Sequence, residues 1–132
     1  MGKIGVLLYE GFQEMEFWYP VLRLREIGAD VEVIGVEGKE AATSVLGYPV
    51  VPNVAMADTA PDKYAALMIP GGNVTRLVEN AALHSFLRTA ADKGVRIAAA
   101  SQATALAPNA LVARTTDDVP QWTRTLITEL SR

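Results

Sequence analysis

The sequence predicts an α/β fold of the doubly wound type, with helices on both faces of a mostly parallel sheet. Three apolar runs, at Lys3–Tyr9, Asp30–Val36 and Tyr64–Pro70, are typical of strands buried on both faces. Stretches with a helical spacing of apolar residues lie between them. A strand, a helix and a second strand within about thirty residues predict parallel strands joined by a right-handed crossover.

The composition is that of one globular domain over residues 1–132. Hydrophobic residues make up 50% of the chain and charged residues 20%, so the chain can bury a core of ordinary size. The 12 Lys and Arg against 15 Asp and Glu argue against a nucleic-acid partner, which requires a basic face. The absence of cysteine excludes disulfides, zinc–thiolate sites and cysteine nucleophiles.

The sequence contains no targeting or membrane signal. The N-terminus lacks the basic and then apolar pattern of a signal peptide and leads into the first predicted strand. The longest uncharged run, Ile97–Ala113, contains several polar residues and would make a poor membrane span. We therefore expect no membrane partner and a cytoplasmic location.

The first half of the chain is predicted to contain one long helix and one hairpin. The helix runs from about Gln13 to Ile27, ends at Gly28, and is bent by Pro20, which cannot donate a backbone hydrogen bond. A hairpin is expected at Thr43–Pro52 and a connection with one helical turn at Ala57–Lys63. The apolar stripe of the helix is expected to comprise Met15, Trp18, Val21, Leu22 and Leu24.

Apart from the stretch Gly94–Leu106, the second half is predicted to contain three helices and a last short strand. A short helix at Val74–Asn80 precedes a longer one at Ala81–Lys93. The strand is expected at Ala110–Ala113, and the final helix at Asp117–Leu130. The expected N-terminal caps are Asn80 for the middle helix and Thr116 or Asp117 for the last.

The stretch Gly94–Leu106 predicts a short buried strand, a tight turn at Ser101 and Gln102, and a following helix. Many α/β enzymes place a nucleophile at such a corner, because the helix N-terminus stabilises negative charge there. Ligands of doubly wound sheets bind at the carboxyl ends of the strands. The loops at Glu10–Glu16 and Gly71–Val74 are expected at the same edge of the sheet as this corner.

Four stretches of the sequence resemble one known family. They are KIGVLLYEGFQEMEFWYP at the N-terminus, IPGGN after the third strand, GVRIAAAS before the corner, and LVARTTDDVP near the C-terminus. The match covers nearly the whole chain and includes these stretches, and in it the chain resembles the ThiJ/PfpI superfamily, which includes deglycases, isocyanide hydratases and intracellular proteases. The resemblance implies a flavodoxin-like fold.

The resemblance also implies roles for three positions at the predicted site. The family's buried carboxylate corresponds to Glu16, and its oxyanion loop to Gly71-Gly72-Asn73. Its nucleophile elbow corresponds to Ala100–Ala103, where Ser101 stands in place of the family's cysteine. In many members a histidine and a glycine follow that cysteine, whereas this chain has Gln102 and an alanine.

A further departure is that this chain resembles a shortened, truncated member of the family. Family members continue for several dozen residues between the elbow helix and the strand that Ala110–Ala113 resembles, and that segment carries the catalytic histidine. Here residues 106–110 join the two elements almost directly. The one histidine of the chain, His84, lies in the middle of a predicted helix, and we expect it on a solvated face.

Glu16 is the preferred candidate for proton transfer. Its apolar neighbours, Met15 and Phe17–Tyr19, would partly desolvate the carboxylate and so enable it to exchange protons near neutrality. The alternative from the pattern alone is an acidic residue favoured near a helix N-terminus, with its carboxylate in water. Glu10 and Glu14 are expected to be solvated.

Ser101 has two roles open to it. A serine hydroxyl needs a base to become a nucleophile, and Glu16 would activate it less well than a histidine. We favour a hydrogen-bonding role for Ser101 beside Glu16, with covalent catalysis as the alternative. The backbone N–H groups of Gly72 and Gln102 are candidate oxyanion donors, while Asn73 either presents its amide to a ligand or closes the turn.

These features predict a small-molecule enzyme with non-cysteine acid/base chemistry, such as hydration, isomerisation or cyclisation, with Glu16 and Ser101 at its centre. The alternative is a non-catalytic homodimeric binding domain, or a pseudoenzyme derived from a cysteine hydrolase. No cluster has metal-ligand spacing, and we expect neither a metal nor a cofactor. A shortened sheet exposes apolar surface, so we expect a homodimer with the opening helix or Thr43–Pro52 in its interface.

Overall fold

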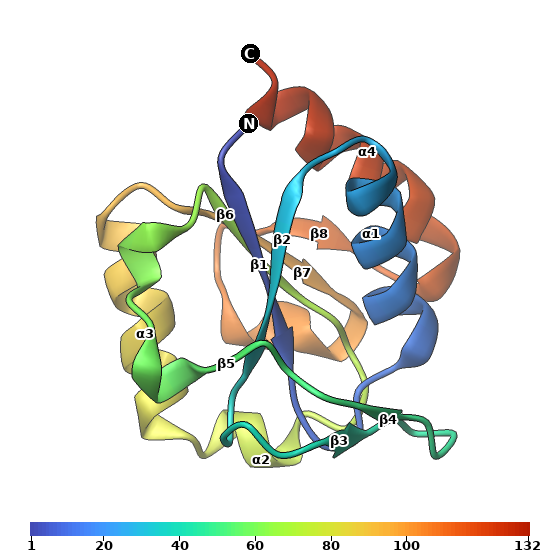
Figure 1. Cartoon of the computed structure of the whole chain (residues 1–132), viewed down its shortest axis with the longest axis vertical. Helices are drawn as coiled ribbons and strands as arrows, with labels where there is room; N and C mark the ends of the chain where they lie inside the picture. The colour runs from blue at the N-terminus through green and yellow to red at the C-terminus, as the bar shows by residue number, and fades with distance from the viewer.

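A computed structural model of the chain describes residues 1–132 and contains one six-stranded sheet in which every neighbouring pair of strands is parallel (Figure 1). The strand order is β5-β2-β1-β6-β7-β8, so the chain builds outward from β1 first on one side and then on the other. A separate antiparallel pair, β3–β4, forms the expected hairpin. The strands are β1 (Lys3–Leu8), β2 (Asp30–Gly35), β3 (Ala42–Thr43), β4 (Pro49–Val50), β5 (Val54–Ala55), β6 (Ala66–Ile69), β7 (Arg96–Ala100) and β8 (Leu111–Ala113).

Helices cover both faces of this sheet, as the doubly wound prediction requires. In Figure 1, α1 and α4 pack side by side on one face and α3 lies on the other. None of the helices combines the length and the apolar character that a membrane crossing needs. The α-helices are α1 (Glu14–Glu26), α2 (Thr75–Val78), α3 (Ala81–Asp92) and α4 (Val119–Leu130), and the 3₁₀ turns are η1 (Met56–Asp58), η2 (Pro61–Lys63), η3 (Ser101–Leu106) and η4 (Thr116–Asp118).

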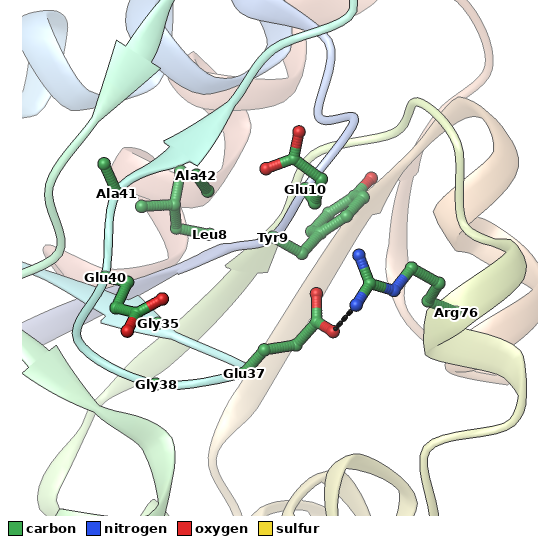
Figure 2. Close-up of a pocket in the computed structure, with 10 residues that line it drawn as sticks. All are labelled: Leu8, Tyr9, Glu10, Gly35, Glu37, Gly38, Glu40, Ala41, Ala42 and Arg76. Carbon is green, nitrogen blue, oxygen red and sulfur yellow. Dashed lines mark ion pairs between the residues drawn. The ribbon is translucent and has the colours of Figure 1, made fainter.

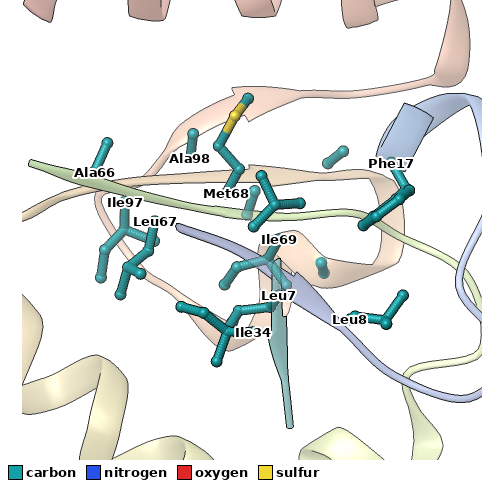
Figure 3. Packing of buried hydrophobic residues seen from close by; sticks show 14 of the residues in the cluster. Leu7, Leu8, Phe17, Ile34, Ala66, Leu67, Met68, Ile69, Ile97 and Ala98 are labelled. Carbon is teal, nitrogen blue, oxygen red and sulfur yellow. The ribbon is translucent and has the colours of Figure 1, made fainter. Parts of the chain in front are cut away.

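The core lies on both faces of the central strands. All four residues of β6 are buried, and so are all residues of β1 after Lys3. Side chains alternate between the faces along each strand: Figure 3 shows Met68 and Ala98 on one side of the sheet and Leu67 and Ile97 on the other. This two-sided burial is the physical reason that the strands appear in the sequence as uninterrupted apolar runs.

Helix α1 differs from prediction in the face that it buries. Phe17, Val21 and Leu24 are fully buried, but Met15 is 54% and Leu22 57% exposed. The predicted stripe was too wide, because α1 contacts the sheet and α4 along one line and leaves its outer side in solvent.

The corner after β7 is followed by the 3₁₀ segment η3, so the predicted helix at this position was wrong in type. Two local features explain the difference. Ala107 precedes a proline and has non-helical backbone angles, with φ of −142° and ψ of 89°, which ends the segment after six residues. The Thr104 hydroxyl donates to the carbonyl oxygen of Ser101 at 2.9 Å and competes for a helical acceptor.

The two predicted caps had different outcomes. Asn80 caps α3 as expected, since its Oδ1 accepts a hydrogen bond from the Leu83 N–H at 2.9 Å. The prediction of a side-chain cap for α4 was wrong, because no side chain bonds to its first turn. Pro120 in that turn has no N–H to satisfy, and the η4 turn leads directly into the helix.

A polar cluster around Glu32 ties β2 to the segment before β6. Tyr64 donates a short hydrogen bond to Glu32, and Lys3 and Lys63 lie 3.7 and 3.3 Å from its carboxylate. The bond from Tyr64 lowers the pKa of Glu32 below its ordinary value of 4.5, against an opposing effect of burial. Burial, together with the same bond, raises the pKa of Tyr64.

The lowered pKa of Glu32 predicts a stability that falls at low pH. A lowered pKa in the folded state means that the contribution of Glu32 is complete above pH 4.5 and is lost as the pH falls through the lowered value. Glu32→Gln should therefore flatten the acid side of the stability curve and cost about 1–3 kcal/mol at neutral pH. Urea unfolding from pH 2 to 8 measures the acid side of the curve and the free energy of unfolding at neutral pH, with the exposed Glu40→Gln as control. An unchanged acid limb in Glu32→Gln would contradict this assignment.

Candidate active site

Four loops meet at the carboxyl end of the sheet, and they carry the candidate site. Strand β1 stands where the chain order reverses, between β2 on one side and β6 on the other. In doubly wound sheets this reversal opens a place for ligands beyond the strand ends. The loops that follow β1, β6, β7 and β8 lead there, and each contributes to the contacts described below.

Backbone hydrogen bonds join the first two of these loops. The Gln13 N–H donates to the Gly71 carbonyl at 2.8 Å, and the Asn73 N–H donates to the Gly11 carbonyl at 2.9 Å. Gly72 lies between them with φ of +133°, and a Cβ there would stand 2.3 Å from the Gly11 carbonyl oxygen. Both the backbone conformation and the space require a glycine at this position.

Helix capping frees the Glu16 side chain for the site. The side chain of Gln13, the N-cap of α1, accepts the Glu16 N–H at 2.9 Å. A glutamate at this third helical position often reaches back to the N–H of the cap residue. Here the Gln13 N–H is already bonded to Gly71, so the Glu16 carboxylate points to the strand ends instead.

Three donors from three different loops hold the Glu16 carboxylate. The Gly71 N–H donates to Oε1 at 2.8 Å, while the hydroxyls of Ser101 and Thr116 donate to Oε2 at 2.6 and 2.9 Å. The side chain is only 2% exposed. The structure thus brings Glu16 and Ser101 into direct contact, and the carboxylate is fixed in one orientation.

Thr116 is the residue that sequence reasoning missed at this site. It had been expected as a helix cap, whereas its hydroxyl bonds to Glu16. The sequence did place Thr116 shortly after the last strand, and a residue in that position lies at the carboxyl end of a parallel sheet, where ligands bind. A hydroxyl there has a choice of partners, and only the packing of α1 beside α4 decides between them.

Ser101 has the strained backbone of a nucleophile elbow. Its φ of +51° falls in the left-handed region, which non-glycine residues rarely occupy. The residue is half-buried, whereas Glu16, to which its hydroxyl donates, is buried. His84 is not part of this arrangement: its Nε2 is hydrogen-bonded to the Val78 carbonyl at 2.8 Å.

The remaining predicted site residues divide into two groups. Gly71 and Gly72 lie at the site, and the Gly72 N–H donates to the side-chain Oε1 of Gln102 at 3.1 Å. Gln102 therefore reaches the site through its side chain. Asn73 turns away from it, since its Oδ1 accepts the Thr75 N–H at 3.3 Å next to α2.

A second carboxylate of α1 is buried, which corrects the expectation that Glu14 is solvated. Glu14 is 9% exposed, and its Oε2 accepts the Leu46 N–H at 2.7 Å. Burial alone would raise the pKa of Glu14, but hydrogen bonds from Ser44 and from two backbone N–H groups outweigh it and lower the pKa. Glu14 thus holds the β3–β4 hairpin against α1.

Tyr9 forms a hydrogen bond that holds the start of the loop after β6. Its hydroxyl donates to the Pro70 carbonyl at 2.6 Å, immediately before Gly71. Burial, and then the charge of Glu16, raise the pKa of Tyr9, so this donor stays protonated.

A polar cavity of about 280 Å³ lies beside the site, at the ends of β1 and β2. Figure 2 shows an ion pair between Glu37 and Arg76, 2.7 Å apart, at this cavity. Neither Glu16 nor Ser101 lines it. No group of three or more His, Cys, Asp or Glu side chains in the chain is placed to hold a metal ion.

Several curated proteins are similar to this chain over part of its length. The chain is 33% identical over 76 residues to deglycase TK1284 of Thermococcus kodakarensis, which covers 58% of this chain and 45% of that protein. It is 34% identical over 76 residues to deglycase PfpI of Pyrococcus furiosus, with the same coverage. Protein dj-1beta of Drosophila melanogaster is 32% identical over 96 residues, which cover 71% of this chain and 51% of that protein. The chain thus spans about half the length of these relatives.

Solved structures agree in fold. The crystal structure of Drosophila melanogaster DJ-1beta superposes with a TM-score of 0.90 at 22% identity, over 98% of this chain and 90% of that one. The C103A mutant of the DJ-1 superfamily protein STM1931 from Salmonella typhimurium gives a TM-score of 0.87 at 20% identity, over the same shares. The sequence profile of the DJ-1/PfpI family matches residues 2–128, and the chain therefore belongs to the DJ-1/PfpI family.

Proposed function

We propose that this chain is a small-molecule enzyme of the DJ-1/PfpI fold that uses acid/base chemistry without a cysteine. The suitable reactions are hydration, isomerisation and cyclisation, each of which moves a proton to or from a carbon or oxygen atom of the substrate. Glu16 is the proton-transfer residue, and Ser101 is its polar partner. The cytoplasmic location expected from the sequence stays a prediction.

The observation that carries this proposal is the contact between Ser101 and Glu16, 2.6 Å apart. A buried carboxylate held by three donors has one fixed orientation, so it needs no rearrangement before it meets a ligand. Ser101 is half-buried whereas Glu16 is buried, so we expect a ligand to meet the serine hydroxyl first. A proton taken from the ligand then passes to Glu16 directly or through that hydroxyl.

A cysteine–histidine hydrolase mechanism is not part of the proposal. The chain has no cysteine, and its one histidine is bonded to α2. Two relatives are named deglycases, which supports an enzyme as the first candidate. Because a serine stands at the elbow, the reaction of this chain would depend on a carboxylate and a hydroxyl in place of a thiolate.

A second candidate is a non-catalytic binding domain or pseudoenzyme. One observation favours it: the Gln102 side chain occupies the Gly72 N–H, which the oxyanion hypothesis requires to be free for a substrate. In that case the same loops would hold a metabolite or no ligand at all.

We also propose a homodimer formed through α1 and the β3–β4 hairpin. Met15 and Leu22 on α1 are more than half exposed, and a hollow of about 620 Å³ lies along the same helix beside Trp18 and Tyr19. Glu14, which is also on α1, accepts the Leu46 N–H and so joins the helix to the hairpin loop. The hairpin segment adds four apolar side chains that are also more than half exposed: Val45, Leu46, Tyr48 and Val51.

The role of Glu16 predicts a large loss of turnover in Glu16→Gln. The amide keeps the size of the carboxylate but cannot accept a proton, so kcat should fall by about 100-fold or more. The measurement is turnover of a substrate found by screening compounds that the genomic neighbours of the gene suggest. Glu10→Gln, at an exposed position of the same loop, is the matched control. A normal rate in Glu16→Gln with a normal fold would refute the mechanism.

The companion variant Ser101→Ala separates the two roles of the serine. If Ser101 is a polar partner, the variant keeps a measurable rate, reduced by about 10-fold. If Ser101 is a nucleophile, the rate is abolished, and mass spectrometry of the quenched wild-type enzyme detects a covalent adduct on the serine. Detection of such an adduct would overturn the hydrogen-bonding role.

Thr116 is predicted to position Glu16. Thr116→Val keeps the shape but removes one donor from Oε2, which should cost about 1–3 kcal/mol of unfolding free energy. Turnover should fall with it, and Thr116→Ser should restore both. Urea unfolding and kinetics of the three forms make the test, with Thr128→Val on the exposed side of α4 as control. Equal stability of Thr116→Val and wild type would rule out this role.

The dimer predicts a mass of two chains in solution at micromolar concentration. Leu46→Asp and Leu22→Asp place a charge in the proposed interface and should yield monomers with an intact fold. Light scattering coupled to size-exclusion chromatography measures the mass. Val78→Asp, at an exposed apolar position on α2 outside this surface, should leave the dimer unchanged. A monomeric wild-type protein would contradict the proposal.

A further inference from the structure

A hollow of about 390 Å³ lies between α3 and η3 and shares no lining residue with the polar cavity at the ends of β1 and β2. Six of the nine residues that line it are hydrophobic. They come from three elements and include Leu87 and Ala91 of α3, Ile97 of β7 and Leu106 of η3. A concave, mostly apolar site of this size with few polar groups is typical of small-molecule binding.

The hollow has one free positive charge at neutral pH, that of Arg88. This residue is exposed on α3 and takes part in none of the ion pairs of the chain. Asp92, four residues later on the same helix, is spaced for a pair with Arg88 but forms none. The other basic residue of the lining, His84, is bonded through Nε2 to the Val78 carbonyl. The guanidinium therefore remains available to a ligand.

No carboxylate lines this hollow, although the chain as a whole carries a net charge of −3. The polar cavity at the ends of β1 and β2 has the opposite composition. There Glu10, Glu37 and Glu40 surround a single cation, Arg76, which is already paired with Glu37. A local excess of positive charge on an acidic protein attracts an anion. Of these two cavities, the one between α3 and η3 is therefore suited to a negatively charged ligand.

We propose that the hollow between α3 and η3 binds a small organic monocarboxylate, whose apolar body fills the hollow and whose carboxylate pairs with Arg88. An arginine donates two parallel hydrogen bonds to a carboxylate, which fixes the orientation of the ligand, and a single cation balances one negative charge. The apolar walls remove the body of the ligand from water and supply the rest of the affinity. Neither Glu16 nor Ser101 lines the hollow, so the inference is independent of the function proposed above.

Binding of three matched probes to the full chain tests this site without any turnover. Hexanoate has both the charge and the apolar body, hexanamide has the body without the charge, and acetate has the charge with almost no body. In ¹⁵N NMR titrations, hexanoate should shift the backbone resonances of Leu87, Ala91 and Leu106 to saturation. It should bind roughly 10-fold more tightly than either of the other probes.

Two variants separate the contribution of charge from that of space. Arg88→Gln removes the cation, so hexanoate should bind roughly 10-fold more weakly while the affinity for hexanamide stays the same. Ala91→Leu fills the hollow from an exposed helical position and should weaken the binding of both probes. The matched controls are Arg25→Gln, at an exposed arginine of α1 outside the ion pairs, and Ala82→Leu, at an exposed alanine of α3 outside the hollow. Both controls should bind the probes as wild type does.

Four results would overturn the inference. The absence of a saturable hexanoate shift at the three reporter resonances shows that the hollow is no binding site. Equal affinities for hexanoate and hexanamide, or an unchanged hexanoate affinity in Arg88→Gln, show that Arg88 does not recognise a carboxylate. A change of mass in Ala91→Leu by light scattering, without hexanoate binding to wild type, assigns the hollow to a second copy of the chain. Failure of the proposed enzyme is read separately, from the kinetics of Glu16→Gln.

Discussion

The hydrogen bonds to the Glu16 carboxylate are the interaction on which the arrangement of the strand ends depends. A carboxylate that is 2% exposed is costly unless donors surround it. The donors come from the loops after β6, β7 and β8, and the acceptor comes from the helix after β1. One side chain therefore fixes the relative positions of four segments. Loss of the carboxylate would leave Gly71, Ser101 and Thr116 without their common partner.

The first turn of α1 also links the site to the outer surface of the molecule. Glu14 and Glu16 are both buried, but they point to different partners. Glu16 faces the strand ends, whereas Glu14 holds the hairpin loop through the Leu46 N–H. A partner that packs on the hairpin would press on the same helical turn that presents Glu16. The proposed dimer interface and the proposed catalytic residues therefore share the first turn of α1, although they use different residues of it.

The corner at Ser101 combines a strained backbone with a hydroxyl side chain. Ser101 has a left-handed backbone, which costs energy and persists only where the surrounding structure holds it. The residue there offers a hydroxyl, and the side chain of Gln102 beside it accepts the Gly72 N–H. The fold, shared with structures at about 20% identity, does not settle the reaction.

The sequence by itself indicated the central strands, the main helices and the corner at Ser101, because apolar periodicity and glycine punctuation are local properties. It did not predict the edge strand β5, and the pattern alone left the pocket position of Glu16 open until the family resemblance favoured it. It did not determine the hydrogen-bond partners of polar side chains that can reach several different partners. Thr116, Glu14 and Gln102 each carry groups that can bond to water, to their own backbone or to a distant loop. The tertiary structure decided these contacts, since they depend on which loops the parallel strands bring together. For the same reason, the burial of Glu14 and the exposure of Met15 became visible only once α1 was packed against α4 and the hairpin.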